Sequence, residues 1–427
     1  MTVSQPISVL TETQQVIGPL RSAFMAPRTD RHHAGPPLGP PLFVIGGGPG
    51  GLAVAAALRE RGVRAVVLEK ASVVGASWRG RYERLRLHTT RRLSALPGLP
   101  LPRQFGRWVA RDDMARYLEK YADVHDLEIV TGVEVFRVEA AEGGGWVLHA
   151  TGGRRLTSTA VVVATGHHHT PLLPDWPGLA GYGGEVVHAA AYRSPAPYTG
   201  KDVLVVGAGN SGAEIAVDLA EGGAARVRLA VRTVPHLVRR SVAGWPAQYT
   251  GVLVRRLPVW LADRVLRLLC RLTVPDLSAH GLPRPTTGLV ARLRGADAFP
   301  VYDTGLVDAV RRGLVEPVAA VESFEQGKVV LADGTVLAPD AVIAATGYRR
   351  ALEDLVGHLG VLDAHGRPLT HGARTPAQAP GLYFTGFTQP VSGTLRELAR
   401  DAARIARAVT TGRPGRGSRR WRAGRRR

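Results

Sequence analysis

An unbroken apolar run, a glycine-rich turn and a run of small apolar residues follow one another in the stretch LFVIGGGPGGLAVAAALRERGVRAVVLEK. The residues at 42–45 predict a buried strand, those at 51–61 predict a helix, and those at 65–68 predict a second strand. Strand, helix and strand in this order are typical of a parallel sheet with crossover helices, so the pattern predicts an α/β fold.

The turn between the first strand and the helix has the glycine spacing of a dinucleotide-binding turn. One glycine permits the tight turn, one lets the backbone approach a pyrophosphate, and one lets the helix pack closely on the strand. Glu69 ends the second strand, where an acid accepts hydrogen bonds from ribose hydroxyls. The predicted binding residues of this first site are Gly46, Gly48, Gly50, Gly51, Glu69 and Lys70.

The same pattern returns at VVGAGNSGAEI, followed by a predicted helix at 211–221 and a predicted strand at 225–231. No acid ends this strand, and the chain continues as VRTVPHLVRR. Because an acid repels a 2′-phosphate and arginine attracts it, the first site favours FAD and the second favours NADPH. The alternative is that these arginines only belong to an arginine-rich surface. The predicted residues of the second site are Gly207, Gly209, Asn210, Ser211, Gly212, Arg232, Thr233 and Arg240.

Two later strands end alike, as AVVVATG at 160–166 and AVIAATGY at 341–348. We expect these segments to be two crossings between domains, one out and one back. The predicted fold is therefore α/β with two Rossmann-like dinucleotide-binding domains, the NADPH domain being inserted in the FAD domain.

The remaining patterns set the domain boundaries. Strands are expected within 129–156, with a turn at the glycines 143–145, and a hairpin is expected around Asp333-Gly334. The predicted order is a flexible lead at 1–40, the FAD domain at 41–170, the NADPH domain at 171–338, the rest of the FAD domain at 339–412, and a disordered arginine-rich tail at 413–427.

The composition fits a globular protein of two or three domains, with 427 residues of which 45% are apolar. No apolar run reaches the roughly 18 residues that a transmembrane helix needs, and the N-terminus lacks the pattern of a secretory signal. The only cysteine, Cys270, cannot form an intramolecular disulfide, so we expect a reducing, cytoplasmic location.

The net charge of +20 raises the question of a nucleic-acid partner. The distribution of this charge argues against a specific nucleic-acid partner, because the last fifteen residues hold eight arginines and no acid. Such a tail either solubilises the protein or contacts phosphates or an anionic membrane surface. A peripheral membrane contact and a homodimer stay open.

Several motifs, in order along the chain, resemble those of the flavin-containing monooxygenases, a family of class B flavoprotein monooxygenases, and within it the plant YUCCA-like branch and its bacterial relatives. YGGEVVHAAAY is similar to the family signature F-x-G-x-x-x-H-x-x-x-Y/F, with Tyr182 in place of phenylalanine. GASWRGRYERLRLHT, LPVWLADRVL and GLYFTGF followed by SGTLRELARDAARIA are also similar to family segments. The resemblance covers residues 41–409.

The resemblance implies an NADPH- and FAD-dependent monooxygenase that transfers one oxygen atom to a small molecule through a flavin C4a-hydroperoxide. The substrate would be a 2-oxo acid, an amine or a sulfide, with molecular oxygen as co-substrate. Because the flavin carries the difficult step, no metal and no covalent nucleophile are expected. The helix at 394–409 would direct its positive end at the reduced flavin. Further expected cofactor-binding residues are Trp78, Val135, Thr165, Gly166, Thr346, Gly347, Gly386 and Gly393.

Asn210 and His88 are the expected catalytic residues, and each has an alternative role. Asn210, like Ser211, either hydrogen-bonds the nucleotide or the flavin peroxide, or caps the helix that begins there. His88 stands where the drug-oxidising members of the family have an asparagine, and it is either a hydrogen-bond donor to the flavin or a packed histidine. Trp78 either packs on the flavin or is an ordinary core aromatic.

Two further stretches have a structural and a functional interpretation. The three histidines at 167–169 cannot all face one metal ion from an extended chain, so a solvated crossing loop is expected. The stretch LPVWLADRVLRLLCRL is amphipathic, with apolar residues on one face and Arg264, Arg267 and Arg271 on another. It either covers the active site, fills a subunit contact or lies on an anionic membrane surface.

Two other functions stay open beside the monooxygenase. A thioredoxin-reductase-type enzyme shares the two-turn plan but needs a Cys-x-x-Cys pair, which a chain with Cys270 alone does not have. An oxidoreductase that passes electrons from NADPH to an external acceptor is therefore one alternative. A flavin-binding module without turnover is the other.

Overall fold

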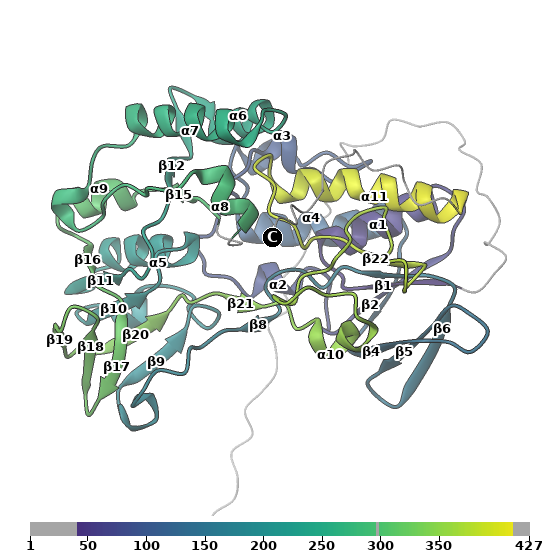
Figure 1. Cartoon of the computed structure of the whole chain (residues 1–427), viewed down its shortest axis with the longest axis horizontal. Helices are drawn as coiled ribbons and strands as arrows, with labels where there is room; N and C mark the ends of the chain where they lie inside the picture. Colours follow the sequence, from purple (N-terminus) through teal and green to yellow (C-terminus); the bar gives the residue numbers. More distant parts are fainter. Residues whose placement is uncertain (1–40, 296–298, 413–427) are drawn as a thin grey trace, which may run out of the picture. The chain divides into compact units, whose positions relative to one another are not determined.

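Two parallel sheets of five strands each carry the two glycine-rich turns (Figure 1). The computed structural model describes residues 41–295 and 299–412. The predicted lead at 1–40 and the predicted tail at 413–427 lie outside these residues. In the part of the chain that is described, no helix is long and apolar enough to cross a membrane.

The first sheet has the strand order β22-β7-β1-β2-β3. Its strands are β1 (Leu42–Ile45), β2 (Ala65–Glu69), β3 (Glu128–Thr131), β7 (Val161–Val163) and β22 (Leu382–Phe384). Helix α1 (Pro49–Arg59) lies between this sheet and α11 (Thr394–Thr411), so small side chains such as Ala53 and Ala56 are buried. The predicted first unit is confirmed, although α1 begins earlier than expected because Pro49 suits the first turn of a helix.

The other face of the first sheet is covered by the antiparallel sheet that the sequence predicts within 129–156. Its strands are β4 (Val135–Ala140), β5 (Trp146–Ala150) and β6 (Arg154–Ser158), with positive φ at Gly143, Gly144 and Gly145 between β4 and β5. Apolar side chains of this sheet and of α10 (Glu353–Val356) share one core with β1 and β22. On the α1 side, α4 (Arg111–Val124) adds Met114 and Leu118 to the core.

The second sheet has the order β16-β11-β10-β20-β9. Its strands are β9 (Glu185–His188), β10 (Asp202–Val206), β11 (Arg226–Ala230), β16 (Glu316–Val318) and β20 (Ala341–Ala344). Helices α5 (Asn210–Glu221) and α9 (Leu306–Arg311) cover one face. The small sheet β17 (Val321–Glu325), β18 (Lys328–Leu331) and β19 (Val336–Leu337) covers the other, and it contains the predicted hairpin at Asp333-Gly334.

The chain crosses between the two sheets twice, and the two crossings are hydrogen-bonded to each other. Strand β8 (Thr170–Pro171) leads out of the first sheet and pairs in antiparallel fashion with β21 (Tyr348–Arg349), which leads back. This arrangement confirms that the second unit is inserted in the first. The predicted boundary at 338/339 is wrong, because β20 follows it and pairs with β10 and β9 of the second sheet. An apolar run predicts a buried strand but does not indicate which sheet the strand joins.

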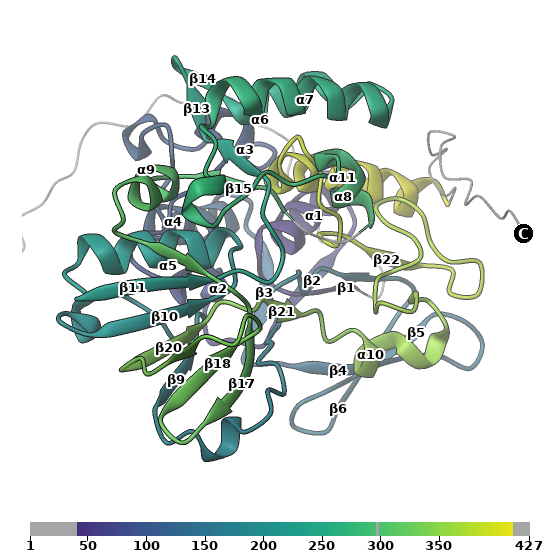
Figure 2. The same ribbon diagram turned by 60° about the vertical axis from the view of Figure 1, so that its left-hand side comes forward.

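A helical segment inserted in the second unit lies over the glycine turns and is called the cap here. It runs from β12 (Leu237–Arg239) to β15 (Val301–Asp303), which pair with each other. Between them lie β13 (Ser241–Val242), β14 (Trp245–Pro246), α6 (Ala247–Val254), α7 (Val259–Thr273) and α8 (Leu289–Gly295) (Figure 2). The predicted amphipathic helix is confirmed as α7, but its apolar face points outward, since Trp260 and Leu272 are 62% and 75% exposed.

The third glycine of the second turn offers a test of this fold. A Cβ on Gly212 would lie 1.8 Å from the carbonyl oxygen of Gly207, whereas a Cβ on Gly209 would meet no atom within 4 Å. Gly212→Ala is therefore expected to lower the free energy of unfolding by about 1–3 kcal/mol, because the helix must move away from the strand. Urea-induced unfolding followed by circular dichroism measures this change.

Gly209→Ala is the matched control in the same turn. Gly209 has φ −81°, which alanine adopts without strain, so its free energy of unfolding is expected to change by less than about 0.5 kcal/mol. Equal losses in the two variants would contradict the close packing of helix and strand at Gly212.

Candidate functional site

One cavity of about 1190 Å³ lies where the two glycine turns face each other. Its wall is formed by both turns, by both crossings between the sheets, and by α6 to α8 of the cap. In open parallel sheets, ligands bind outside the carboxyl ends of the strands, which is where both turns lie. The cavity is therefore the candidate site for both nucleotides and for a substrate.

Most of the predicted site residues line this cavity. They are Gly46, Gly48, Gly50, Glu69, Lys70, Trp78, His88, Val135, Thr165, Gly166, Gly207, Gly209, Asn210, Ser211, Arg232, Thr233, Thr346, Gly347, Gly386 and Gly393. Gly51, Gly212 and Arg240 are not among the lining residues. A side chain on Gly51 would lie 1.9 Å from the carbonyl oxygen of Gly46, so Gly51 and Gly212 serve the close packing of helix on strand.

Glu69 is held in place by the backbone of the first turn. Its Oε2 accepts a hydrogen bond from the N–H of Gly47 at 2.6 Å, and its Oε1 accepts one from the N–H of Ala71 at 2.9 Å. The carboxylate is thereby fixed at the cavity wall beside the turn. A Cβ on Gly48 would meet no atom within 4 Å, so a ligand can approach the backbone there.

The end of β11 presents a cation to the cavity. The side chain of Arg232 is exposed, and within residues 41–295 and 299–412 it makes no ion pair or hydrogen bond. Thr233 lies next to it at the wall. Arg232 and Thr233 together offer the positive charge and the hydroxyl group that can bind a phosphate ester.

Arg240 does not join this pair, which corrects the sequence-based prediction. Its guanidinium carbon lies 4.7 Å from the centre of the Trp108 ring, and burial lowers its pKa. The negative charge of Glu214 acts against this lowering of the pKa. The sequence shows two arginines near the end of β11 but not which way each side chain turns.

Asn210 holds the cap to the second turn. Its Nδ2 donates to the carbonyl oxygen of Pro300 at 3.0 Å, and its Oδ1 accepts from the N–H of Tyr302 at 2.8 Å. Gly209 occupies the cap position of α5 and no side chain caps this helix, so the capping role considered for Asn210 and Ser211 is wrong. Both polar atoms of the Asn210 side chain are therefore hydrogen-bonded to the segment around β15, which precedes α9.

His88 lies half-buried at the cavity wall, among other polar side chains. Its ring is stacked on Tyr302, with the ring centres 5.3 Å apart and an angle of 16° between the planes. Its Nε2 lies 3.6 Å from Oε1 of Glu214. Burial, reinforced by the charge of Arg240, lowers the pKa of His88 to about 4, so the ring is neutral at neutral pH.

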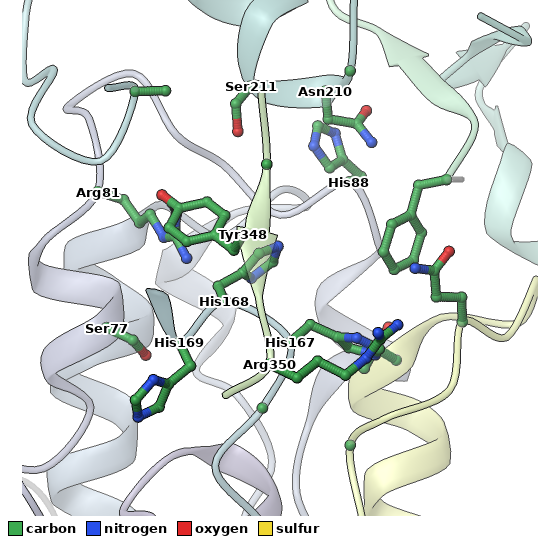
Figure 3. A pocket seen from close by; sticks show the side chains of 18 of the residues that line it. Ser77, Arg81, His88, His167, His168, His169, Asn210, Ser211, Tyr348 and Arg350 are labelled. Carbon is green, nitrogen blue, oxygen red and sulfur yellow. Dashed lines mark hydrogen bonds between the residues drawn. The ribbon is translucent and has the colours of Figure 1, made fainter. Parts of the chain in front are cut away.

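The three consecutive histidines lie in the crossing loop, as expected, and they also line the cavity, with His168 exposed and His167 and His169 half-buried. Figure 3 shows them pointing in different directions. His169 Nε2 lies 3.0 Å from Lys70 Nζ, and the His168 ring meets the Tyr348 ring edge-on at 4.9 Å. Among the described residues, no group of three or more His, Cys, Asp or Glu side chains is arranged to hold a metal ion.

Sequence reasoning missed a contact between Arg81 and Tyr348 that joins the two domains at the cavity. Arg81 donates to the hydroxyl of Tyr348 at 2.6 Å, and its guanidinium carbon lies 4.9 Å from the centre of that ring (Figure 3). Tyr348 is the last residue of the second crossing motif, and Arg81 lies inside GASWRGRYERLRLHT. Both motifs were visible, but nothing in the sequence indicates that they meet.

The signature at 182–192 also connects structural elements. His188 ends β9, and its Nε2 lies 3.0 Å from the carbonyl oxygen of Gly347 in the second crossing. Tyr192 is buried and donates a hydrogen bond to Asp218 Oδ2 on α5 at 2.8 Å. The motif therefore holds β9, α5 and the crossing together beside the cavity.

The chain is similar to a family of pyridine-nucleotide enzymes and to several named plant proteins. Residues 43–245 match the family model described as pyridine nucleotide-disulphide oxidoreductase. A probable indole-3-pyruvate monooxygenase of Arabidopsis thaliana, YUCCA3, is 34% identical over 81% of this chain and 82% of that protein. Indole-3-pyruvate monooxygenase YUCCA1 of Oryza sativa subsp. japonica is 36% identical over 82% of this chain and 87% of that protein.

A solved structure supports the same relationship. The flavin-containing monooxygenase from Stenotrophomonas maltophilia superposes with a TM-score of 0.67 and 27% identity, covering 87% of this chain and 98% of that one. The two glycine turns and the inserted second domain fit the same family as these relatives do. The chain belongs to the flavin-containing monooxygenases, with plant YUCCA enzymes and a bacterial enzyme among its relatives.

Proposed function

We propose that this enzyme binds FAD at the first turn and NADPH at the second, and that it inserts one atom of molecular oxygen into a small molecule held between them. The observation that carries the proposal is the single cavity shared by both turns, with the fixed acid Glu69 at one end and the exposed Arg232 at the other. Bound FAD supplies oxygen activation, and NADPH supplies the hydride.

The residues of this chain would then bind and orient the cofactors. The backbone at Gly48 and Gly209 leaves room for the two pyrophosphates, each at the N-terminus of a helix. Glu69 would accept hydrogen bonds from the ribose of FAD, and Arg232 with Thr233 would bind the 2′-phosphate of NADPH. Gly393 and Thr394, at the start of α11, line the cavity and would face the flavin with the positive end of the helix.

The cap would exclude water and provide the apolar part of a substrate site. Its contribution to the wall is mostly apolar and includes Val238, Leu266, Leu289, Leu293 and Phe299, beside the polar side chains of Arg292 and Tyr302. Val391 of the C-terminal part packs against the same group. A substrate with a flat aromatic or aliphatic side chain fits such a wall better than a charged one does.

A 2-oxo acid is the substrate class that we favour over an amine or a sulfide. Arg81 lines the cavity, and in the described parts of the chain no carboxylate lies within ion-pair distance of it. A cation without an acidic partner suits the carboxylate of an acidic substrate. The plant relatives are named as indole-3-pyruvate monooxygenases, and that compound is a 2-oxo acid with an aromatic side chain.

The overall reaction is balanced for such a substrate. One 2-oxo acid, one O₂, one NADPH and one proton give a carboxylic acid shorter by one carbon, one CO₂, one NADP⁺ and one water. An amine or a sulfide would instead gain one oxygen atom without loss of carbon. The products therefore distinguish the substrate classes.

The cytoplasmic location, the homodimer and the peripheral membrane contact stay predictions. The outward apolar face of α7, with Leu268 and Leu272 beside Arg264 and Arg271, is the surface on which a dimer or membrane contact is expected. Analytical ultracentrifugation distinguishes a dimer, and co-sedimentation with anionic vesicles distinguishes a membrane contact.

The substrate class is tested with the FAD-loaded enzyme, NADPH and ¹⁸O₂ on a panel of an aromatic 2-oxo acid, a tertiary amine and a thioether. We expect the 2-oxo acid to yield a shortened acid that carries one ¹⁸O, together with one equivalent of CO₂. Mass spectrometry measures both products. NADPH consumption that gives only stoichiometric hydrogen peroxide with every substrate would contradict oxygenation and favour electron transfer to an external acceptor.

The cofactor assignment is tested with Arg232→Ala. A lost charge-assisted hydrogen bond to the 2′-phosphate is expected to raise the KM for NADPH about 10- to 100-fold, while the KM for NADH, which has no such phosphate, changes less than about 2-fold. Steady-state kinetics with the two nucleotides measures the difference.

The matched control for this variant is Arg226→Ala. Arg226 lies at the other end of β11, where it forms an exposed ion pair with Glu316 at 2.6 Å. Its loss is expected to leave both KM values unchanged. An equal rise of KM for NADPH and NADH in Arg232→Ala would rule out the 2′-phosphate assignment.

A further inference from the structure

A buried carboxyl group stands behind the cavity wall at Glu214, four residues along α5 from Asn210. It is only 4% exposed and is not among the residues that line the cavity. Its Oε2 accepts a hydrogen bond from the hydroxyl of Tyr82 at 2.5 Å, and its Oε1 accepts a longer one from Thr304 at 3.5 Å. Neither of the two proposed nucleotide sites uses the Glu214 carboxyl group.

The group that Glu214 faces across the wall is His88. The distance from Oε1 to Nε2 of His88 is 3.6 Å, and the stacking of the ring on Tyr302 fixes the orientation of the imidazole. Because His88 is neutral at neutral pH, it carries a single N–H, on either Nε2 or Nδ1.

The surroundings of the two ring nitrogens differ. Nε2 faces a carboxylate oxygen, which is an acceptor. Nδ1 is enclosed and, within the described parts of the chain, has no hydrogen-bond partner. A buried N–H without an acceptor is unfavourable, so the proton belongs on Nε2 and the lone pair on Nδ1.

We propose that Glu214 is a positioning residue that fixes the tautomer of His88, with the proton on Nε2 and with Nδ1 unprotonated. With its one N–H directed at Glu214, His88 has no N–H to donate to a bound ligand. This polarity is the opposite of the donor role that the sequence suggests. It excludes His88 as the group that binds a substrate carboxylate.

The charge on Glu214 decides how firmly this tautomer is held. Tyr82, Arg84 and Arg240 are the titratable groups that face the carboxyl besides His88, and all three favour its ionised form. Burial acts in the opposite direction and more strongly, and it raises the pKa of Glu214 to about 7. The protonated carboxyl can donate to Nε2, so the His88 proton is expected to move to Nδ1 as the pH falls below about 7.

The tautomer is read directly from the ¹⁵N chemical shifts of the histidine ring in the FAD-loaded protein. The His88 signals are assigned by their loss in His88→Asn. At pH 8.5 we expect the wild type to carry the proton on Nε2. A proton on Nδ1 of the wild type at this pH would overturn the proposal.

Glu214→Gln tests the cause of this tautomer. The glutamine oxygen can still accept from Tyr82, while its amide N–H donates to Nε2 of His88, so the ring proton is expected on Nδ1 at pH 8.5. An unchanged tautomer in this variant would overturn the proposal. Tyr82→Phe is the matched control, because it removes the hydrogen bond from Tyr82 to Glu214 but keeps the carboxyl group that faces His88, and Nε2–H is expected to persist.

The effect of this tautomer on a bound ligand rests on the proposed function, but the tautomer itself does not. A wild type with the Nε2–H tautomer and no ¹⁸O-labelled product would refute the proposed function and leave the tautomer assignment intact. Labelled product from a wild type with the Nδ1–H tautomer would support the proposed function and refute the role of Glu214.

Discussion

The site depends on one short backbone pairing, in which β8 and β21 run antiparallel beside each other with Tyr348 opposite Pro171. Each of these crossings continues from the carboxyl end of a parallel strand, β7 in the first sheet and β20 in the second. Pairing the crossings therefore brings the carboxyl edges of both sheets to one cavity. Both glycine turns lie at these edges, so the topology itself makes the two nucleotide sites face each other.

Side chains reinforce this pairing at the places where the two domains touch. Arg81 reaches Tyr348 in the second crossing, and Tyr82, the next residue, reaches Glu214 on α5. The segment 81–88 thus contacts the crossing with one residue and the second domain with another. Its sequence resembles that of the family beside the flavin, and the structure gives the resemblance a physical reason: the segment must satisfy partners in both domains.

The fold was largely predictable from the sequence because its strands and helices are set by local patterns. Continuous apolar runs, glycine spacing and the hairpin at Asp333-Gly334 each depend on neighbours in the chain. The boundary at 338/339 failed because the choice of sheet for β20 depends on residues far away in the sequence. Most of the backbone positions expected to bind the cofactors line the cavity, since a turn fixes where its glycines lie.

Side-chain direction was the part that the sequence did not determine. Arg232 and Arg240 belong to the same basic stretch of the sequence. Arg232 lines the cavity, whereas Arg240 stacks on Trp108 from the first domain. Asn210 stands in a turn that suggests capping, but its amide binds the cap strand at Tyr302. Each outcome depends on a contact made across many residues, and a local pattern carries no information on such contacts.

Burial has a common electrostatic consequence for the titratable groups around the cavity. The pKa of His88 is lowered to about 4, while that of Tyr302 is raised to about 12. Desolvation is the largest cause in every case, and it favours the neutral form each time. These neutral groups offer hydrogen bonds of fixed direction, whereas Glu69, Arg81 and Arg232 supply charges at the wall. The direction of each hydrogen bond, as at His88, then matters more than its strength. The demanding chemistry is left to the bound cofactors.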